Sequence, residues 1–515
     1  DWLYRASWDA DWHTAAYYQL AQMDCERGNY DVALDHVNRS LTTNTENIAA
    51  LNLKGVILRH LGATAAAEEH LVAVIEKTKI NNMAMNELIL LGTAKGNLAE
   101  LSRGMKDDQQ AYLELASEYM QSGQWQEAYD VLARIQAKGN TYPMIYYAAG
   151  YMKQQMGDND AAKAYYVKGS QMPHDYCYPF RAEESKMLLA AMEMVPTDAK
   201  APYYLGNLYY EHQPQKAIEL WERSRELDGT FYITHRNLAL AYKDIEQDYA
   251  KALESITRAN QYNSSDPRLL FETDVINNLN GLSAKEKYEY LIKNRKTAEK
   301  HYETLLRLIT RAVEYGKYDE ALDLLDSNDI IESEGAREKQ SAYLNSYALK
   351  AWNLLGRGRA SAALTVMEKA LDYPVGLYGR AQYAQLYYIT ALAYEKKGDK
   401  VKANEYYNMA ISDVEIGRGS DREYIYYIGL AQKALGKSAD AEATFNSLLS
   451  NTDSAGASQF GGTRTANVTQ QAQEYYLNGL GQLGLGKNAE AKSAFTKALE
   501  LNSGLIWART LGGIK

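Results

Sequence analysis

Six polar and aromatic side chains near the middle of the chain have the types and spacing of a binding surface. They are Tyr203, Asn207, Tyr210, Arg236, Asn237 and Lys243. Asn207 and Asn237 occupy matching positions in the segments APYYLGNLYY and ITHRNLALAY. Amide groups both donate and accept hydrogen bonds, whereas guanidinium and ammonium groups donate and carry positive charge. Such a set can bind a peptide segment, and its chemistry is recognition rather than bond making.

Two further motifs contain groups that could do chemistry. Pro173–Pro179 contains His174 and Cys177, and a thiol beside an imidazole can form a nucleophile or a metal site. Two prolines frame this segment, however, so we predict a structural elbow that redirects the chain. Gly479–Gly484 spells the dinucleotide fingerprint G-x-G-x-x-G, but no strand precedes it, and we expect it to lie inside a helix.

The sequence contains no further catalytic or metal-binding motif that we recognise. It has no H-E-x-x-H pair, no C-x-x-C, no G-x-S-x-G elbow and no phosphate-binding loop. Cys25 and Cys177 lie far apart without the spacing of metal ligands, so we expect free thiols. We therefore predict that this region is not an enzyme and uses no cofactor and no metal, while a domain upstream of it could be enzymatic.

The elements that must position these groups follow from a pattern of small residues. A glycine, an alanine five residues later and a bulky apolar residue four beyond the alanine recur nine times. The glycines are Gly28, Gly62, Gly123, Gly157, Gly316, Gly358, Gly398, Gly436 and Gly486. Seven residues before the glycine stands an alanine or glycine in eight of the nine repeats, and Ile309 is the exception.

This pattern has a specific physical meaning. The glycine ends one helix because it adopts a left-handed backbone at no steric cost. The small residue and the alanine then lie where two antiparallel helices cross, and we expect the bulky residue to fill the gap towards the next pair. This is the tetratricopeptide signature. We predict an all-α, tetratricopeptide-repeat superhelical solenoid of about twelve helix pairs with non-repeat helical inserts.

Tyrosines often occur in adjacent pairs near the middle of an expected first helix. Examples are Tyr146/Tyr147, Tyr203/Tyr204 and Tyr426/Tyr427. We expect one ring of each pair to fill the core and the other to face the concave groove with its hydroxyl in water.

The segments between regular repeats divide the chain. We expect an N-terminal cap or a linker from a missing upstream domain at 1–12, followed by N-terminal repeats at 13–172 with an irregular insert at 80–106. An elbow and inserted helix at 173–197 then lead to central repeats at 198–300 and C-terminal repeats at 301–449. We expect a flexible loop at 450–470 and a last repeat with a capping helix at 471–515. Trp2, Trp8 and Trp12 are expected to pack onto the first repeat or onto the upstream domain.

Charge and hydropathy exclude two classes of partner. The net charge of −10 argues against non-specific nucleic-acid binding, which needs a basic surface. No stretch approaches the roughly 18 apolar residues of a membrane span. The chain starts at Asp1 with neither methionine nor signal peptide, so we expect that a segment precedes it. Its location stays open between a bacterial cytoplasm and periplasm.

Several segments, some of them outside the repeats, resemble a bacterial protein family. They are Lys79–Leu91, Ala111–Leu132, Pro173–Glu184, Asp198–Tyr210, Ala217–Asp228 and His235–Tyr242. Members of that family carry an N-terminal β-sandwich domain of uncharacterised function, followed by a long tetratricopeptide region. The resemblance implies that this chain is the C-terminal repeat region of a longer protein with a link to carbohydrate processing.

The resemblance to tetratricopeptide proteins also suggests a ligand. Asn207 and Asn237 fall where peptide-binding members place two asparagines that bind a C-terminal carboxylate. Tyr203 replaces the lysine that completes such a clamp, so only Arg236 or Arg268 could supply the charge.

We predict a non-catalytic scaffold whose concave groove binds a protein or peptide segment, or the chain's own upstream domain. Two alternatives stay open. The chain could be an accessory region of a carbohydrate-active or glycan-binding protein, shaping the cleft of the upstream sandwich, or it could be a dimerisation arm.

Overall fold

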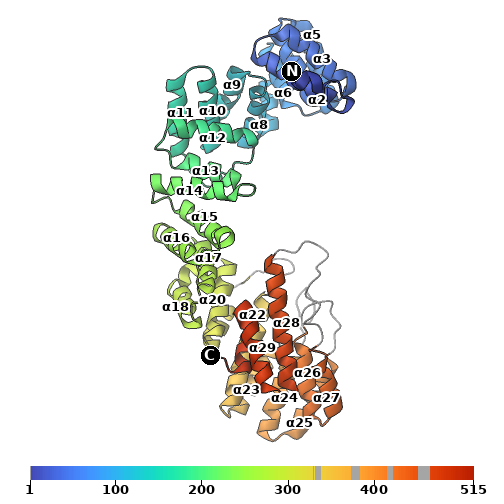
Figure 1. Ribbon diagram of the computed structural model, residues 1–515, viewed down its shortest axis with the longest axis vertical. Helices are drawn as coiled ribbons and strands as arrows, with labels where there is room; N and C mark the ends of the chain where they lie inside the picture. Colours follow the sequence, from blue (N-terminus) through green and yellow to red (C-terminus); the bar gives the residue numbers. More distant parts are fainter. Residues whose placement is uncertain are drawn as a thin grey trace. The chain divides into compact units, whose positions relative to one another are not determined.

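The computed structural model describes residues 2–328, 330, 338–372, 383–413, 422–449 and 464–514. Within these residues the chain forms thirty α-helices and one π-helical turn, and no strand (Figure 1). The predicted all-α fold is confirmed. The chain divides into two compact units, Asp1–Glu246 and Gln247–Lys515, and each is described by itself.

The first unit contains fifteen α-helices and ends in the π-helical turn η1. Their bounds are α1 (Trp2–Ala6), α2 (Ala10–Glu26), α3 (Tyr30–Thr43), α4 (Ile48–His60), α5 (Thr64–Thr78), α6 (Asn82–Leu90), α7 (Leu98–Met105), α8 (Gln109–Met120), α9 (Trp125–Gln136), α10 (Pro143–Gln155), α11 (Asn159–Gln171), α12 (Ala182–Met194), α13 (Lys200–Tyr209), α14 (Pro214–Leu227), α15 (Tyr232–Ala241) and η1 (Tyr242–Glu246).

The described residues of the second unit form the remaining fifteen helices. These are α16 (Tyr249–Tyr262), α17 (Pro267–Leu279), α18 (Ala284–Lys293), α19 (Arg295–Ala298), α20 (Tyr302–Glu314), α21 (Tyr318–Ser327), α22 (Glu338–Gly356), α23 (Ala360–Leu371), α24 (Ala384–Lys397), α25 (Lys400–Ser412), α26 (Tyr424–Ala434), α27 (Ser438–Asn446), α28 (Arg464–Gly484), α29 (Asn488–Leu501) and α30 (Ile506–Gly512). In this unit α24 packs against both α22 and α26, and α26 against α28 (Figure 1).

The turn glycines lie where the repeat pattern places them. All nine have a left-handed backbone, with φ between +71° and +89°. Each stands in the short turn between the two helices of a pair, as Gly28 does between α2 and α3. The predicted mechanism of chain reversal is confirmed, because this conformation is one that other residues adopt only at a steric cost.

The small residue before the turn lies under the bulky side chain of its own helix pair. A Cβ atom on Gly55 would lie 2.3 Å from Leu71, and one on Gly429 would lie 2.4 Å from Phe445. The bulky residue therefore packs first over its own pair. We also expected the bulky residue to fill the gap towards the next helix pair. Phe445 does so, because a Cβ atom on Gly484, which lies on α28 of the next pair, would be 2.2 Å from the ring of Phe445.

We expect Gly429→Ala to destabilise the second unit by about 1–3 kcal/mol, because the added methyl group forces Phe445 out of its packed position. Denaturation by urea, followed by circular dichroism, measures this change. Gly356→Ala is the matched control, since a Cβ atom there meets nothing within 4 Å. Equal stability of the two variants would contradict the packing described here.

Paired tyrosines are buried together more often than the sequence predicts. Both rings of Tyr146/Tyr147, Tyr203/Tyr204 and Tyr426/Tyr427 are buried. The prediction that one ring of each of these pairs faces water is wrong. The second ring instead packs between helices: the ring of Tyr147 on α10 lies 6.0 Å from that of Tyr204 on α13, and α12 packs against both of these helices.

The tryptophans at the N-terminus do not pack onto the first repeat. The side chains of Trp2, Trp8 and Trp12 are 82%, 86% and 62% exposed, so that part of the prediction is wrong. The first repeat helix, α2, begins at Ala10, before the predicted start of the repeats.

The C-terminal segment differs in part from the prediction. Residues 450–463 of the predicted loop at 450–470 lie outside the described residues, but α28 begins at Arg464, so 464–470 are helical. The predicted capping helix is present as α30. Its Trp507 is buried, donates a hydrogen bond to Asn345 of α22 (2.8 Å) and lies 6.2 Å from the ring of Trp352. This helix therefore packs against a first helix as well as against the end of the stack.

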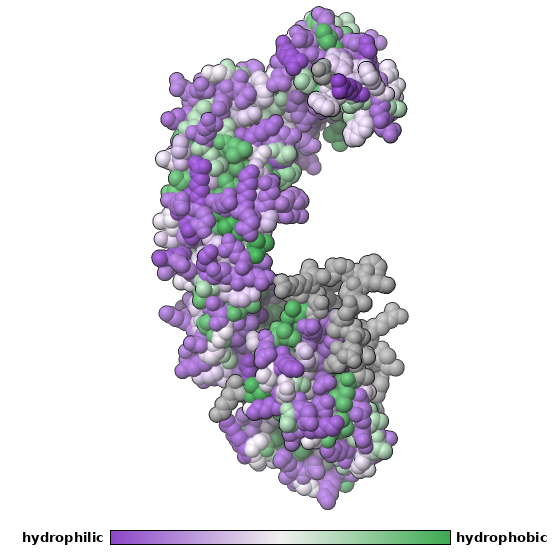
Figure 2. Space-filling model, viewed as in Figure 1, coloured by the Kyte–Doolittle hydropathy of each residue, from purple (hydrophilic) through white to green (hydrophobic). Residues whose placement is uncertain are grey.

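Hydrophilic residues predominate on the visible face of the described chain (Figure 2). On the face seen in Figure 2, hydrophobic residues form scattered patches within a mostly hydrophilic surface. Among the described residues, no helix combines the length and the apolar composition needed to cross a membrane.

Candidate binding pocket

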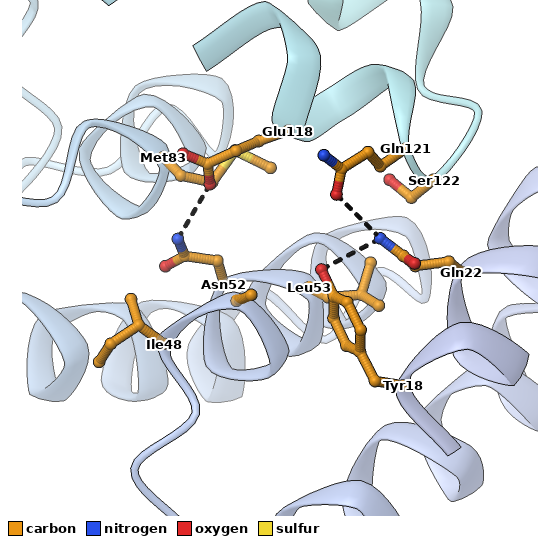
Figure 3. A pocket seen from close by; sticks show the side chains of 10 residues that line it. Tyr18, Gln22, Ile48, Asn52, Leu53, Met83, Glu118, Gln121 and Ser122 are labelled. Atoms are coloured by element: carbon orange, nitrogen blue, oxygen red, sulfur yellow. Dashed lines mark hydrogen bonds between the residues drawn. The ribbon is translucent and has the colours of Figure 1, made fainter. Parts of the chain in front are cut away.

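Four first helices of the N-terminal unit, α2, α4, α6 and α8, surround a pocket of about 320 Å³ (Figure 3). Its lining residues are Tyr18, Gln22, Ile48, Ala49, Asn52, Leu53, Met83, Glu118, Gln121 and Ser122. This pocket was not predicted from the sequence. Each lining residue belongs to a first helix or to the residues directly after α8, as expected for the concave surface of such a stack.

The short third helix pair explains why these helices converge. Helices α6 and α7 contain only 9 and 8 residues, whereas α2, α4 and α8 contain 17, 13 and 12. The fourth pair therefore packs back against the first two pairs. At the α8–α9 turn the approach is so close that a Cβ atom on Gly123 would lie 2.8 Å from the Cα atom of Glu26.

Gln22 joins one wall of the pocket to the other. Its Nε2 atom donates to the hydroxyl of Tyr18 (3.0 Å) and to Oε1 of Gln121 on the opposite wall (3.3 Å; Figure 3). Its Oε1 atom accepts from Nε2 of Gln19 (2.9 Å). These contacts fix the orientation of the amide and hold α8 against α2.

Asn52 holds the carboxylate of the pocket in place. Its Nδ2 atom donates to Oε2 of Glu118 (3.2 Å; Figure 3), and its Oδ1 atom accepts from Nδ2 of Asn81 (2.8 Å). Burial raises the pKa of Glu118, the hydrogen bond from Asn52 lowers it, and nearby Glu114 raises it again, with a net increase. The pocket therefore contains a partly desolvated carboxylate.

Tyr18 supplies a hydroxyl that stays protonated at neutral pH. Burial raises the pKa of Tyr18 to about 12, and the negative charge of Glu118 acts in the same direction. The pocket thus combines hydroxyl, amide and carboxylate groups with the apolar side chains of Ile48, Leu53 and Met83.

A buried ion-pair network supports the pocket. Arg59 of α4 contacts Glu87 of α6 (2.7 Å) and Glu127 of α9 (2.9 Å). The hydroxyl of Tyr119 on α8 donates to Oε1 of Glu87 (2.7 Å) and accepts from Nδ2 of Asn86 (2.6 Å). Side chains from four helices are thereby joined around one guanidinium group.

The six residues predicted from the sequence lie on α13, at its C-terminal end, on α15 and on η1. Tyr203 is only 4% exposed, and its ring packs against Phe231 at 5.0 Å. The prediction that Tyr203 lines a surface is therefore wrong. The ring of Tyr210 lies 5.2 Å from Trp221, and Lys243 forms an ion pair with Asp244. Arg236 is half-buried.

The structure brings Asn207 and Asn237 together. Nδ2 of Asn237 donates to Oδ1 of Asn207 (2.9 Å), which also accepts from Nε1 of Trp221 (3.1 Å). The matching positions in consecutive first helices are thus neighbours, as expected. These hydrogen bonds occupy donors and acceptors that the sequence analysis assigned to a ligand.

The elbow segment does not present a nucleophile. Cys177 is buried, and burial raises the pKa of its thiol to about 12, so the reactive thiolate is disfavoured. The ring of His174 packs edge-on against Phe231 at 5.0 Å. The segment leads into α12, and its interpretation as a structural elbow stays a prediction.

The dinucleotide-like motif at Gly479–Gly484 lies within α28, as predicted. A Cβ atom on Gly479 would lie 2.5 Å from Phe495, so this glycine permits close helix packing. In the described part of the chain, no group of three or more histidine, cysteine, aspartate or glutamate side chains is arranged to hold a metal ion.

Comparison with known proteins supports tetratricopeptide repeats in both units. Models described as "Tetratricopeptide repeat" match residues 145–172 and 349–421. These repeats match the helix pairs α10–α11 and, where the chain is described, α22–α25.

Several solved structures are also similar to this chain. YrrB, described as a tetratricopeptide protein with an unusual peptide-binding site, is 16% identical over 44% of this chain and 93% of its own, with a TM-score of 0.26. PilF of Pseudomonas aeruginosa is 16% identical over 46% and 97%, with a TM-score of 0.28. The APC/C hetero-tetramer Cut9–Hcn1 matches with 10% identity over 97% and 95%, with a TM-score of 0.26.

Proposed function

We propose that this tetratricopeptide-repeat chain is a scaffold that binds an extended segment of a partner protein in the pocket between α2, α4, α6 and α8. Tetratricopeptide repeats commonly mediate protein–protein contacts. The observation that supports this site is a pocket whose polar side chains are already oriented by hydrogen bonds between α2, α4 and α8.

The composition of the pocket suits a peptide. The backbone of a bound segment needs hydrogen-bond donors and acceptors, which the amide of Gln121 and the hydroxyl of Tyr18 supply. Its side chains need apolar contacts, which Ile48, Leu53 and Met83 supply. Because Gln22 and Asn52 are held in place before binding, little side-chain entropy is lost when the ligand enters.

A blocking substitution tests this site. We select peptides on the full chain from a random peptide library and measure their affinity by fluorescence polarisation. Ala49→Phe places a ring in the pocket and is expected to weaken binding by about tenfold or more, because it excludes the ligand from its contacts.

Ala66→Phe is the matched control, because Ala66 is an exposed residue of the second helix α5 outside the pocket. This variant is expected to bind like the wild type. Circular dichroism checks that both variants keep the fold. Selection of no binding peptide, or equal affinity of both variants for all selected peptides, would rule out the pocket as the binding site.

The surface of Asn207, Tyr210, Arg236, Asn237 and Lys243 stays a prediction as a second binding region. The carbohydrate-associated role implied by the family resemblance also stays a prediction. Asn237→Leu in the same peptide assay tests the first of these.

A further inference from the structure

We propose that the pocket selects a cationic group of the bound segment, a lysine ammonium or an arginine guanidinium, with Glu118 as its counter-ion. This inference rests on the proposed function, because it names the chemistry that the same site prefers. It reverses the charge expected for a carboxylate-binding clamp.

Glu118 has no positively charged partner in the part of the chain that the structure describes. Asn52 donates to its Oε2 atom, and within the described residues no cation forms an ion pair with this carboxylate. None of the ten lining residues is a lysine, arginine or histidine. A partly buried carboxylate without a counter-ion is unfavourable, so a cation that enters the pocket recovers interaction energy.

Other poorly exposed carboxylates of this unit show the usual arrangement. Glu87 and Glu127 both contact Arg59, and Asp24 contacts His36 at 2.7 Å. Asp198 is compensated differently, by three hydrogen bonds from the Tyr147 hydroxyl and two backbone amides. Glu118 has one hydrogen bond, so it is the least compensated of this set.

The shape and lining of the pocket favour a long side chain. A volume of about 320 Å³ is near the lower end of the range for ligand pockets. Ile48, Leu53 and Met83 offer apolar surface, and Glu118 offers the charge. Lysine and arginine combine an apolar stem with a charged end, which matches this arrangement.

The experiment uses the peptides selected on the full chain. Each lysine is replaced in turn with norleucine, which keeps the four-carbon stem and removes the charged nitrogen, and each arginine with citrulline, which keeps the length and removes the charge. The free and acetylated N-termini are compared as a second source of positive charge. Affinities are measured for the wild type and for Glu118→Gln, which keeps an oxygen that accepts from Asn52.

We expect removal of one particular charge to weaken binding to the wild type about tenfold, and to have little effect on binding to Glu118→Gln. Such coupling identifies the two groups as partners. Glu114→Gln is the matched control, because Glu114 is an exposed carboxylate one turn earlier on α8. This variant should respond to charge removal as the wild type does.

The possible failures are distinguishable. Some peptides could bind Ala49→Phe more weakly than the wild type, yet keep their affinity for the wild type when their charges are removed. This result would overturn the cationic preference and leave the proposed function intact. Equal loss in the wild type and Glu118→Gln would also overturn it. If Ala49→Phe weakens the binding of no peptide, both the proposed function and this inference fail.

Discussion

Replacing Asp274 with alanine is expected to lower the free energy of unfolding of the Gln247–Lys515 unit by about 3–5 kcal/mol. Asp274 is fully buried and accepts hydrogen bonds from Nε of Arg307 (2.9 Å) and from Nη2 of Arg311 (2.9 Å). Arg311 is only 2% exposed. Removing the carboxylate leaves Arg307 without this ion-pair partner and leaves Arg311 with Glu314 (2.8 Å), and solvent cannot replace the lost contacts at Arg311.

Hydrogen exchange followed by mass spectrometry measures this effect in the full chain, because peptides from α17 and α20 report on the second unit alone. Asp323→Ala is the control, since Asp323 is exposed on α21 and its loss should change stability by less than about 0.5 kcal/mol. A loss of under about 1 kcal/mol for Asp274→Ala would show that this ion pair is not buried as described.

Replacing Arg59 with methionine is expected to cost the first unit about 3–5 kcal/mol and to abolish peptide binding at the pocket. Arg59 contacts Glu87, whose side chain is completely buried, and Glu127. Without the guanidinium, the buried carboxylate of Glu87 loses its counter-ion and keeps only the hydrogen bond from Tyr119. The links from α4 to α6 and α9 are lost as well, so the pocket walls are no longer held together.

The stabilisation that Arg59 contributes through Glu127 depends on pH. Burial by itself would raise the pKa of Glu127, but hydrogen bonds from His60, from its own backbone and from Arg59 outweigh burial and lower it to about 2. A carboxylate with a lowered folded-state pKa stabilises the fold above its ordinary pKa and loses this effect as the pH falls towards 2. The stability difference between wild type and Arg59→Met should therefore be largest near neutral pH and narrow below about pH 4.5.

Urea denaturation of both proteins between pH 7 and pH 3 checks this profile. Arg39→Met is the control, because the ion pair of Arg39 with Asp35 is more than half exposed and solvent screening leaves it little effect on stability. A difference between wild type and Arg59→Met that grew with falling pH would contradict the assignment of Arg59 as the partner of Glu127.

Some errors of the sequence analysis have a common physical cause. The prediction for Tyr203 assumed that polar or aromatic residues on a first helix face the groove. The ring instead fills space between α13 and the residues before α15, as its contact with Phe231 shows. A local pattern identifies which face of a helix is apolar, but it does not show how closely the neighbouring helix approaches.

The pocket could not be predicted for a related reason. Gln22 contacts Gln121, and Asn52 contacts Glu118, across 99 and 66 residues of sequence. The only signal in the sequence was the irregular segment at 80–106, and its consequence depends on how the next pair packs after two short helices.

The sequence by itself determined the helix pairs of this protein. Turn glycines such as Gly28 and Gly486, and small residues such as Gly55, act within one pair, so their roles follow from neighbouring residues. Only the tertiary structure decided where the pocket forms and which carboxylate lines it. That outcome depends on the angle between successive pairs, and this angle results from packing between residues that are distant in the sequence.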